Sequence, residues 1–321
     1  MSKPRLVLTR RLPAQVETEL AERFELLTNA PDGLLSSADI IERVRAHRAD
    51  ALLVTLTERL DGDFFAALPD HLRVICTYSV GTNHLDIDAA RAKGVALAFT
   101  PEAVTEATAD VALLLLLAAC RRAHEFQAIL RQGRWGAWNA WDNLGWDPGG
   151  QVLGLVGMGR IGQAVARRAR AFGMHIHYFQ RNRLDEAQEQ GAVYHASLES
   201  LFRASRFVSL HTPTTPQTKG FINAESLSWL PPGAIFINTA RGDQVNDDAL
   251  VAALRNGNLA AAGLDVFAGE PDFDRRYLDI PNAYLLPHIG TSTEQTRIRM
   301  GRDAAANLCA FFENRSMPWP I

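Results

Sequence analysis

The stretch that decides the fold is Gln151-Val-Leu-Gly-Leu-Val-Gly-Met-Gly-Arg-Ile-Gly162, followed directly by Gln163-Ala-Val-Ala-Arg-Arg-Ala-Arg170. Its apolar start predicts a buried parallel strand, and its end predicts a helix. Between them, Gly157 permits a tight turn, Gly159 lets the backbone approach a pyrophosphate, and Gly162 lets the helix pack on the strand. Free N–H groups at the helix start attract an anion, so this order of elements predicts a dinucleotide site rather than an unliganded glycine turn.

Length and composition limit the classes of protein that fit. The 321 residues predict two domains, and the net charge of -3 provides no basic field for nucleic acid or an anionic membrane. The 3 cysteines are widely spaced and form no metal-binding or disulfide pattern, so we expect no metal and a reducing, cytoplasmic setting. The longest apolar run, Val111–Cys120, is about half the length that spans a bilayer, and the N-terminus does not resemble a signal peptide.

Short β-rich runs alternate with helical patterns along the chain, which predicts an α/β fold with two doubly wound parallel-sheet domains. We expect a helix over residues 37–44 that is capped by Ser37, and one long helix over Thr105–Arg122. The expected strands are Arg5–Thr9, Phe24–Leu27, Ala51–Thr55, Val74–Thr77 and Val95–Phe99 before the glycine loop, and His175–Phe179, Phe207–Leu210, Ala234–Asn238, Ala260–Leu264 and Ala283–Leu286 after it.

A tryptophan-rich segment precedes the glycine loop. The stretch from Gly133 to Trp146 includes Trp135, Trp138 and Trp141, and it predicts neither a strand nor a good helix. So much aromatic surface is costly to expose, so we expect a partner subunit or the other lobe to cover it. The alternative is a loop that folds back on its own chain.

The strand after the glycine loop ends in Gln180-Arg181-Asn182-Arg183. An NAD site usually has an acidic residue here, which accepts hydrogen bonds from the adenosine ribose. Gln180 carries no charge, and Arg181, assisted by Asn182 or Arg183, can bind a 2′-phosphate that a carboxylate would repel. The pattern therefore predicts that NADP is preferred and NAD is accepted less well. The alternative is a solvated pair of arginines at a strand end.

Three polar side chains follow apolar strands further along the chain. Arg241, Glu270 and His288 are each expected at the carboxyl end of a strand, where open α/β sheets bind ligands. Reducing a 2-keto acid requires a cation for the carboxylate and carbonyl and an acid that protonates the oxygen. Arg241 suits the first task and His288 the second, with Glu270 favouring the imidazolium and orienting the ring. Taken singly, each residue also has a purely structural explanation. Arg241 could belong to a turn, Glu270 could be an ordinary loop acid, and His288 could be a buried histidine.

Several motifs together resemble the D-isomer-specific 2-hydroxyacid dehydrogenases, and most closely the glyoxylate/hydroxypyruvate reductase and 2-ketogluconate reductase branch. These motifs are Leu153–Gly162, Ile237–Asp243, Ala262–Phe267 with Gly269–Pro271, and Pro287–Gly290, and the likeness covers nearly the full length. It implies a Rossmann cofactor domain, residues 101–287, inserted into a flavodoxin-like substrate domain made of residues 1–100 and 288–321. It also implies an active site between the lobes and a homodimer built through the cofactor domain.

The resemblance further implies roles for individual residues. Arg241 would anchor the substrate, and Glu270 and His288 would form the acid pair. The implied cofactor contacts beyond the glycine loop are Thr105, Arg160, Ile161, Thr212, Pro213, Thr239, Ala240 and Asp265. The implied substrate contacts are Ser79, Val80 and Gly81, with Trp138 or Trp141 reaching the pocket of a partner subunit.

The expected activity is reduction of glyoxylate, hydroxypyruvate or 2-ketogluconate to a D-2-hydroxy acid, with a small molecule as the only substrate and neither nucleic acid nor membrane as a partner. Formate dehydrogenases share the scaffold but pair the histidine with glutamine, whereas this chain has Glu270; a phosphite-oxidising branch has lysine at the position of Val80. Two alternatives keep the same motifs: a nucleotide-sensing, corepressor-like binding protein, and a dehydrogenase that uses NAD on another 2-hydroxy acid.

Overall fold

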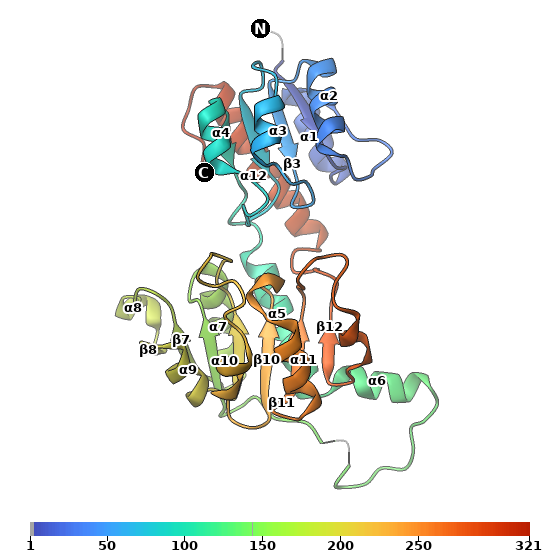
Figure 1. Ribbon diagram of the computed structural model, residues 1–321, viewed down its shortest axis with the longest axis vertical. Coiled ribbons are helices and arrows are strands. Elements are labelled where there is room, and N and C mark those ends of the chain that lie inside the picture. Colours follow the sequence, from blue (N-terminus) through green and yellow to red (C-terminus); the bar gives the residue numbers. More distant parts are fainter. Residues whose placement is uncertain (1–2, 143) are drawn as a thin grey trace. The chain divides into compact units, whose positions relative to one another are not determined.

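The computed structural model describes residues 3–142 and 144–321. The chain divides into unit 1, Met1–Val104 with Thr291–Ile321, and unit 2, Thr105–Gly290. Each unit is a parallel sheet flanked by helices (Figure 1). The predicted domain boundaries differ from these by a few residues, because residues 101–104 group with unit 1 and residues 288–290 with unit 2.

The sheet of unit 1 has the strand order β2-β1-β3-β4-β5, and all of its pairings are parallel. This is the flavodoxin-like order, and buried apolar clusters lie on both faces of the sheet. The strands are β1 (Arg5–Leu8), β2 (Glu25–Leu27), β3 (Ala51–Val54), β4 (Val74–Thr77) and β5 (Ala96–Ala98), and the helices are α1 (Ala14–Arg23), α2 (Ser37–His47), α3 (Gly62–Ala67), α4 (Ile87–Lys93) and α12 (Glu294–Phe312).

The predicted cap of α2 is wrong by one residue. Ser36 is the N-cap: its Oγ accepts a hydrogen bond from the N–H of Asp39 at 3.2 Å, and the Asp39 carboxylate accepts one from the N–H of Ser36 at 3.0 Å. This reciprocal pair satisfies two donors at the helix start, which Ser37 inside the first turn does not do.

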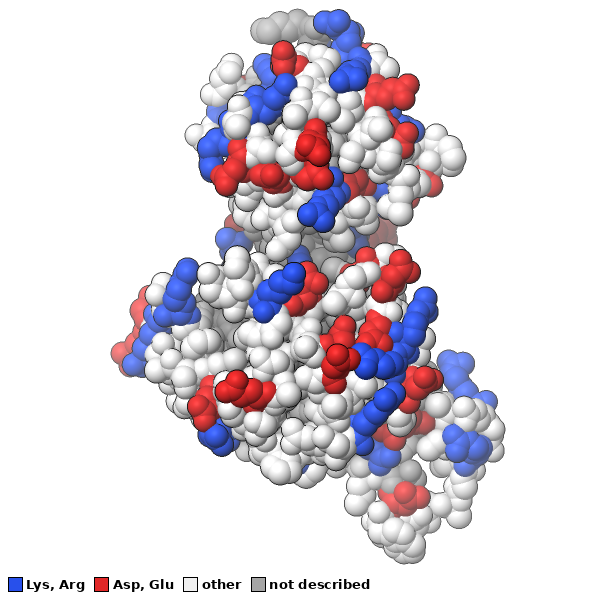
Figure 2. All heavy atoms as spheres, in the orientation of Figure 1, with Lys and Arg blue, Asp and Glu red and all other residues white. Residues whose placement is uncertain are grey.

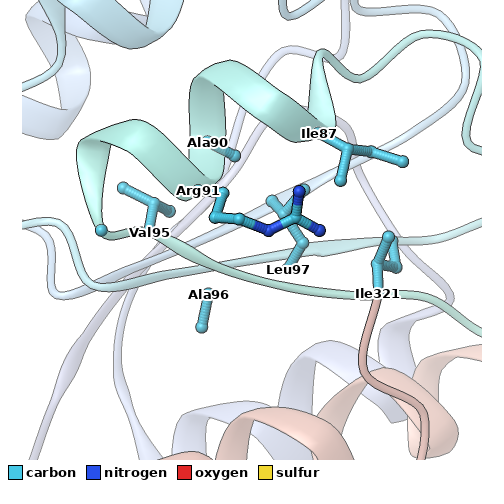
Figure 3. A pocket seen from close by; sticks show the side chains of 8 residues that line it. Ile87, Ala90, Arg91, Val95, Ala96, Leu97 and Ile321 are labelled. Carbon is cyan, nitrogen blue, oxygen red and sulfur yellow. The ribbon is translucent and has the colours of Figure 1, made fainter.

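The C-terminal residues cover the edge of the unit 1 sheet. The N–H of Ile321 donates to the carbonyl of Leu97 at 2.9 Å, and the N–H of Phe99 donates to the carbonyl of Trp319 at 3.1 Å. A hollow of about 310 Å³ lies beside this pairing, and the side chain of Arg91 extends across it (Figure 3). Its lining includes Val95, at the start of β5, so it does not lie at the carboxyl edge where such sheets bind ligands.

The sheet of unit 2 has the order β12-β11-β10-β9-β6-β7-β8 and is also parallel throughout. Read from β8, this is the Rossmann order 3-2-1-4-5-6 with β12 added at the end. The strands are β6 (Val152–Val156), β7 (His175–Phe179), β8 (Val193–His195), β9 (Phe207–Leu210), β10 (Ala234–Asn238), β11 (Leu259–Leu264) and β12 (Ala283–Leu285). The short edge strand β8 was not predicted, because its residues are exposed or half-buried and form no apolar run.

Helix α5 (Thr105–Cys120) confirms the helix expected over Thr105–Arg122, and a second helix that was not predicted, α6 (Ala123–Arg131), follows it. The break between them is at Arg122, whose φ of +54° cannot continue a right-handed helix. The Arg122 guanidinium also donates to Glu125 at 2.7 and 3.0 Å. The remaining helices of unit 2 are α7 (Arg160–Ala171), α8 (Glu186–Glu189), α9 (Leu198–Ala204), α10 (Ala224–Ser228) and α11 (Asp247–Arg255), with 3-10 turns at Gly242–Gln244 and Arg275–Asp279.

Within residues 3–142 and 144–321, no helix is both long enough and apolar enough to cross a bilayer. The described part of the tryptophan-rich segment, residues 133–142 and 144–146, forms neither helix nor strand, as its sequence predicts.

Candidate active site

The glycine loop lies where the strand order of unit 2 reverses, between β6 and β9. A Cβ atom on Gly157, whose φ is +97°, would lie 2.7 Å from the carbonyl oxygen of His211, and one on Gly162 would lie 2.2 Å from the carbonyl oxygen of Gly157. A Cβ on Gly159 would meet nothing within 4 Å. The first and third glycines are therefore required by packing, whereas the second leaves open space beside the backbone. This is the arrangement that a pyrophosphate requires.

The start of α7 is free to bind an anion. Its N-cap is Gly159, no side chain caps it, and its first turn contains no acidic residue. The N–H groups of the first turn therefore have neither a capping partner nor a neighbouring negative charge. Arg160 is exposed at this end of the helix, and Ile161 packs partly against the core beneath it. Their role at a pyrophosphate stays a prediction.

The loop after β7 carries the residues expected at a 2′-phosphate. Gln180 ties this loop to the glycine loop, because its Oε1 accepts from the N–H of Met158 at 3.0 Å and its Nε2 donates to the carbonyl of Asn182 at 2.7 Å. Arg181 is exposed and forms no hydrogen bond or ion pair within the described chain. Arg183, in contrast, donates to Glu189 through two nitrogens, at 2.8 and 3.0 Å. Arg181 is therefore free to bind a phosphate, whereas Arg183 is already paired with a carboxylate.

Buried polar atoms without partners lie beside the carboxyl ends of β9 and β10. They are Nδ1 of His211, Oγ1 of Thr239 and Oε1 of Gln244, as judged within the described residues. Burial lowers the pKa of His211 to about 3, so its ring is neutral at pH 7. Buried polar atoms normally find partners, so this edge fits a polar ligand such as a dinucleotide.

The other predicted cofactor residues lie on the same unit. The carbonyl of Thr212 accepts from Nε2 of Gln244 at 2.9 Å, and that of Pro213 accepts from the hydroxyl of Thr218 at 2.9 Å. Thr105 is the first residue of α5. The roles predicted for these residues at the cofactor stay predictions.

The turn that carries Arg241 is held by a buried amide. Oδ1 of Asn238, a residue only 1 % exposed, accepts from the N–H of Ala240 at 2.9 Å, and its Nδ2 donates to the carbonyl of Arg241 at 3.0 Å. A Cβ on Gly242 would lie 1.8 Å from the carbonyl carbon of Phe267. This turn therefore packs directly on the loop after β11. Sequence reasoning gave Asn238 no role, although an Asn after a strand is a typical turn residue.

The guanidinium of Arg241 is partly buried and donates to the carbonyl of Ala240 at 2.6 Å. Burial lowers the pKa of Arg241, and the nearby charges of Glu270 and Asp243 oppose that shift. Arginine stays protonated across the range in which proteins fold, so a cation stands next to Glu270.

Glu270 and His288 form a direct pair. Oε2 of Glu270 lies 2.7 Å from Nδ1 of His288, its Oε1 accepts from the N–H of Phe267 at 2.7 Å, and both paired side chains are 30 % exposed. Burial alone would raise the pKa of Glu270, but the hydrogen bond and charge of His288 outweigh burial and lower it. An ionised carboxylate only accepts hydrogen bonds, so Nδ1 of His288 is the donor and Nε2 is left to face a ligand.

Asp265 holds the backbone that carries His288. This residue is 1 % exposed, and its two carboxylate oxygens accept from the N–H groups of Ile289 at 2.7 Å and Gly290 at 2.8 Å. His288 itself has a φ of +54°, in the left-handed region that side chains other than glycine rarely adopt. Burial raises the pKa of Asp265, while the two backbone hydrogen bonds oppose that shift. The structure thus gives Asp265 a supporting role that sequence reasoning missed.

In unit 1, the predicted substrate loop follows β4. The Ser79 hydroxyl donates to the carbonyl of Gly81 at 2.7 Å, so the Thr77 hydroxyl must donate to Ser79 across the 2.8 Å between them. The Thr77 oxygen then accepts from Nε2 of His84 at 2.9 Å. This chain of hydrogen bonds uses the Ser79 hydroxyl within the loop, which leaves backbone N–H groups around Val80 as the predicted anion contacts. His84 is a further residue to which sequence reasoning gave no role.

Trp138 and Trp141 are 87 % and 79 % exposed, and neither is buried by its own chain. The segment is anchored near its end, because the guanidinium of Arg206 stacks on the ring of Trp146 with 3.6 Å between Cζ and the ring centroid. Among the described residues, no group of three or more His, Cys, Asp or Glu side chains is arranged to hold a metal ion.

Comparison with known proteins identifies the family of this chain. Residues 113–290 match the family described as D-isomer specific 2-hydroxyacid dehydrogenase, NAD binding domain. The chain is 40 % identical to a glycerate dehydrogenase of Hyphomicrobium methylovorum, with 100 % of both chains covered. It is 41 % identical to a glyoxylate reductase of Thermococcus onnurineus, with 98 % of this chain and 95 % of the relative covered.

A solved structure shows the same likeness. It is an NADPH-dependent glyoxylate/hydroxypyruvate reductase from Sinorhizobium meliloti, determined with NADP and malonate. Its TM-score is 0.88 at 33 % identity, with 100 % of this chain and 97 % of that chain covered. The chain therefore belongs to the D-isomer specific 2-hydroxyacid dehydrogenase family and is an NAD(P)-dependent oxidoreductase of that family.

Proposed function

We propose that this enzyme reduces small 2-keto acids to D-2-hydroxy acids and prefers NADPH. Glyoxylate and hydroxypyruvate are the proposed substrates, with 2-ketogluconate as a further candidate. The observation that carries the proposal is the Glu270–His288 pair. Oε2 of Glu270 lies 2.7 Å from Nδ1 of His288, and the charge of Arg241 acts on the same carboxylate. An acid, its carboxylate partner and a fixed cation are the groups that reduction of a 2-keto acid requires.

Each of these side chains has one task. When bound, a reduced nicotinamide supplies the hydride that adds to carbon 2 of the substrate. Arg241 presents a planar set of N–H donors that binds the substrate carboxylate and polarises the adjacent carbonyl. Nε2 of His288 donates the proton to the carbonyl oxygen, while Glu270 fixes the orientation of the ring. We further propose that backbone N–H groups of the loop Ser79–Gly81 bind the same carboxylate.

The proposed NADPH preference rests on the loop after β7. Gln180 provides no carboxylate for the ribose hydroxyls, and Arg181 is an exposed cation without a partner in the described chain. The relative crystallised with NADP is NADPH-dependent by its description, which supports the same preference here.

The relatives support the choice of substrate, since two of the compared proteins are a glyoxylate reductase and a glyoxylate/hydroxypyruvate reductase. The same motifs would serve a nucleotide-sensing binding protein or an NAD-dependent dehydrogenase of another 2-hydroxy acid. The compared relatives are enzymes by their descriptions, which favours the enzyme. No oxidation of NADPH with any 2-keto acid of a panel would favour the binding role instead.

We also propose that the protein acts as a homodimer on small molecules, without nucleic acid or a membrane as a partner. The exposed tryptophans Trp138 and Trp141 provide an apolar surface that a second copy would cover. Figure 2 shows basic and acidic side chains interspersed on the face in view, without an extended field of one sign that would attract a polyanion.

Replacing His288 tests the proposed proton donor. We expect His288→Gln to lower kcat for glyoxylate by about 10²–10⁴-fold, because the glutamine amide cannot donate a proton to the carbonyl oxygen. Binding of NADPH should be unchanged. The matched control is His175→Gln, at the exposed amino end of β7, which should retain full activity. Full activity of His288→Gln would remove His288 from the mechanism.

Replacing Gln180 tests cofactor selectivity. In Gln180→Asp, a carboxylate would repel the 2′-phosphate and accept hydrogen bonds from ribose hydroxyls, so the ratio of kcat/KM for NADPH to that for NADH should fall at least about tenfold. Gln180→Asn has the same shorter side chain without the charge and should change the ratio much less. An equal ratio in wild type and Gln180→Asp would place selectivity elsewhere.

The dimer is tested by the mass of the protein in solution. We expect a dimer for the wild type and a shift to monomer for the double variant Trp138→Ser/Trp141→Ser, because the apolar surface that stabilises association is lost. Leu34→Ser removes another exposed apolar side chain, in unit 1, and should leave the dimer intact. Sedimentation of the wild type as a monomer would refute the proposal.

A further inference from the structure

We propose that Glu189 holds Arg183 away from the 2′-phosphate, so that Arg181 is the single arginine of the loop that binds it. The inference rests on the NADPH preference proposed above and names the arginine that produces it and the carboxylate that limits it. It assigns different roles to two arginines of one loop, either of which can bind a phosphate.

The pairing of Arg183 with Glu189 is close and bidentate. Nε and Nη2 of Arg183 donate to the two carboxylate oxygens at 2.8 and 3.0 Å. Paired in this way, the two planar groups match in geometry as well as in charge. To bind a phosphate, Arg183 would have to give up both bonds and leave behind a carboxylate whose residue is only 5 % exposed. Leaving such a buried carboxylate without its ion-pair partner is costly, so the pair persists.

Glu189 is itself fixed by its surroundings. Its Oε1 also accepts from the hydroxyl of the buried Tyr178 at 2.6 Å, and that hydroxyl accepts from the N–H of Leu184 at 3.0 Å. Arg170 of α7 donates to the carbonyl of Glu189 at 2.9 Å. The hydrogen bonds from Arg183 and Tyr178 hold the pKa of Glu189 at about 2, so the carboxylate is charged throughout the working pH range.

Arg181 lies two residues before Arg183 in the same loop, but it has no ion-pair partner in the described chain. Its side chain is exposed and has no hydrogen-bonding or ionic partner within residues 3–142 and 144–321. Gln180, its neighbour, is bound to the glycine loop through the N–H of Met158 at 3.0 Å, so the loop is held beside the expected pyrophosphate site. A phosphate on the adenosine ribose would therefore meet one unpaired guanidinium and one that is already neutralised.

Equilibrium binding separates these roles without relying on turnover. Calorimetric titrations would measure the affinities of NADP⁺, NAD⁺, 2′,5′-ADP and ADP for the wild type and for Arg181→Ala, Glu189→Gln and Arg183→Ala/Glu189→Gln. Arg181→Ala should weaken binding of NADP⁺ and 2′,5′-ADP about tenfold or more, because it removes a charge-assisted hydrogen bond, and should leave NAD⁺ and ADP unchanged. The matched control, Arg183→Ala/Glu189→Gln, removes both charges of the pair and leaves no carboxylate without its cation, so it should change the NADP⁺ affinity less than about twofold.

Glu189→Gln removes the charge and one of the two acceptor oxygens, so it frees Arg183. We expect NADP⁺ and 2′,5′-ADP to bind several-fold more tightly, with unchanged NAD⁺ binding showing that the loop is still folded. Adding Arg183→Ala should abolish that gain. Weakening of NADP⁺ binding by Arg183→Ala/Glu189→Gln to the level of Arg181→Ala would overturn the inference.

The same titrations distinguish failure of this inference from failure of the proposed NADPH preference. If the wild type prefers NADP⁺ and Arg181→Ala removes that preference, but Glu189→Gln gains nothing, only the role of Glu189 is refuted. If the wild type binds NAD⁺ as tightly as NADP⁺, the proposed NADPH preference is refuted, and the inference falls with it.

Discussion

The structure of the site depends on one buried carboxylate. Both carboxylate oxygens of Asp265 accept hydrogen bonds from backbone N–H groups, those of Ile289 and Gly290. These bonds fix the segment that begins with His288. A left-handed backbone at a residue other than glycine costs about 1–3 kcal/mol, and hydrogen bonds to a charged group contribute about 1.5–3 kcal/mol each. The two hydrogen bonds therefore offset the strain at His288, and they also satisfy a carboxylate that burial would otherwise destabilise.

The parallel sheet brings the other residues of the site beside this segment. β10, β11 and β12 are neighbours, and the chain after each of them carries Arg241, Glu270 and His288 in turn. Gly242 allows the first two loops to touch, because any side chain there would collide with Phe267. The glycine loop and Gln180 follow β6 and β7 on the other side of β9, so the predicted chemical groups and the predicted adenosine contacts occupy different ends of one carboxyl edge.

Much of this could be predicted from sequence because its signals are local. Buried strands such as Ala234–Asn238 are apolar runs, and the glycine spacing has a direct steric meaning that the contacts of Gly157 and Gly162 confirm. The family assignment is confirmed by the comparisons. The capping residue of α2 was missed because single hydrogen bonds decide it, and helix α6 was not predicted.

The supporting contacts were missed for a different reason. The hydrogen bonds of Asp265 to Ile289 and Gly290 join residues 24 and 25 positions apart, and only the folded chain brings them together. Sequence reasoning likewise let Arg183 assist Arg181, and it missed the bidentate pairing of Arg183 with the buried Glu189.

The most direct test of the central claim is kcat/KM for NADPH-dependent glyoxylate reduction by Asp265→Asn. Asparagine has one acceptor oxygen, and its NH₂ group would face a backbone N–H, so one of the two hydrogen bonds is lost. We predict a fall of about tenfold or more, because the backbone of His288 is no longer held in its left-handed conformation. A wild-type value of kcat/KM in this variant would contradict the account.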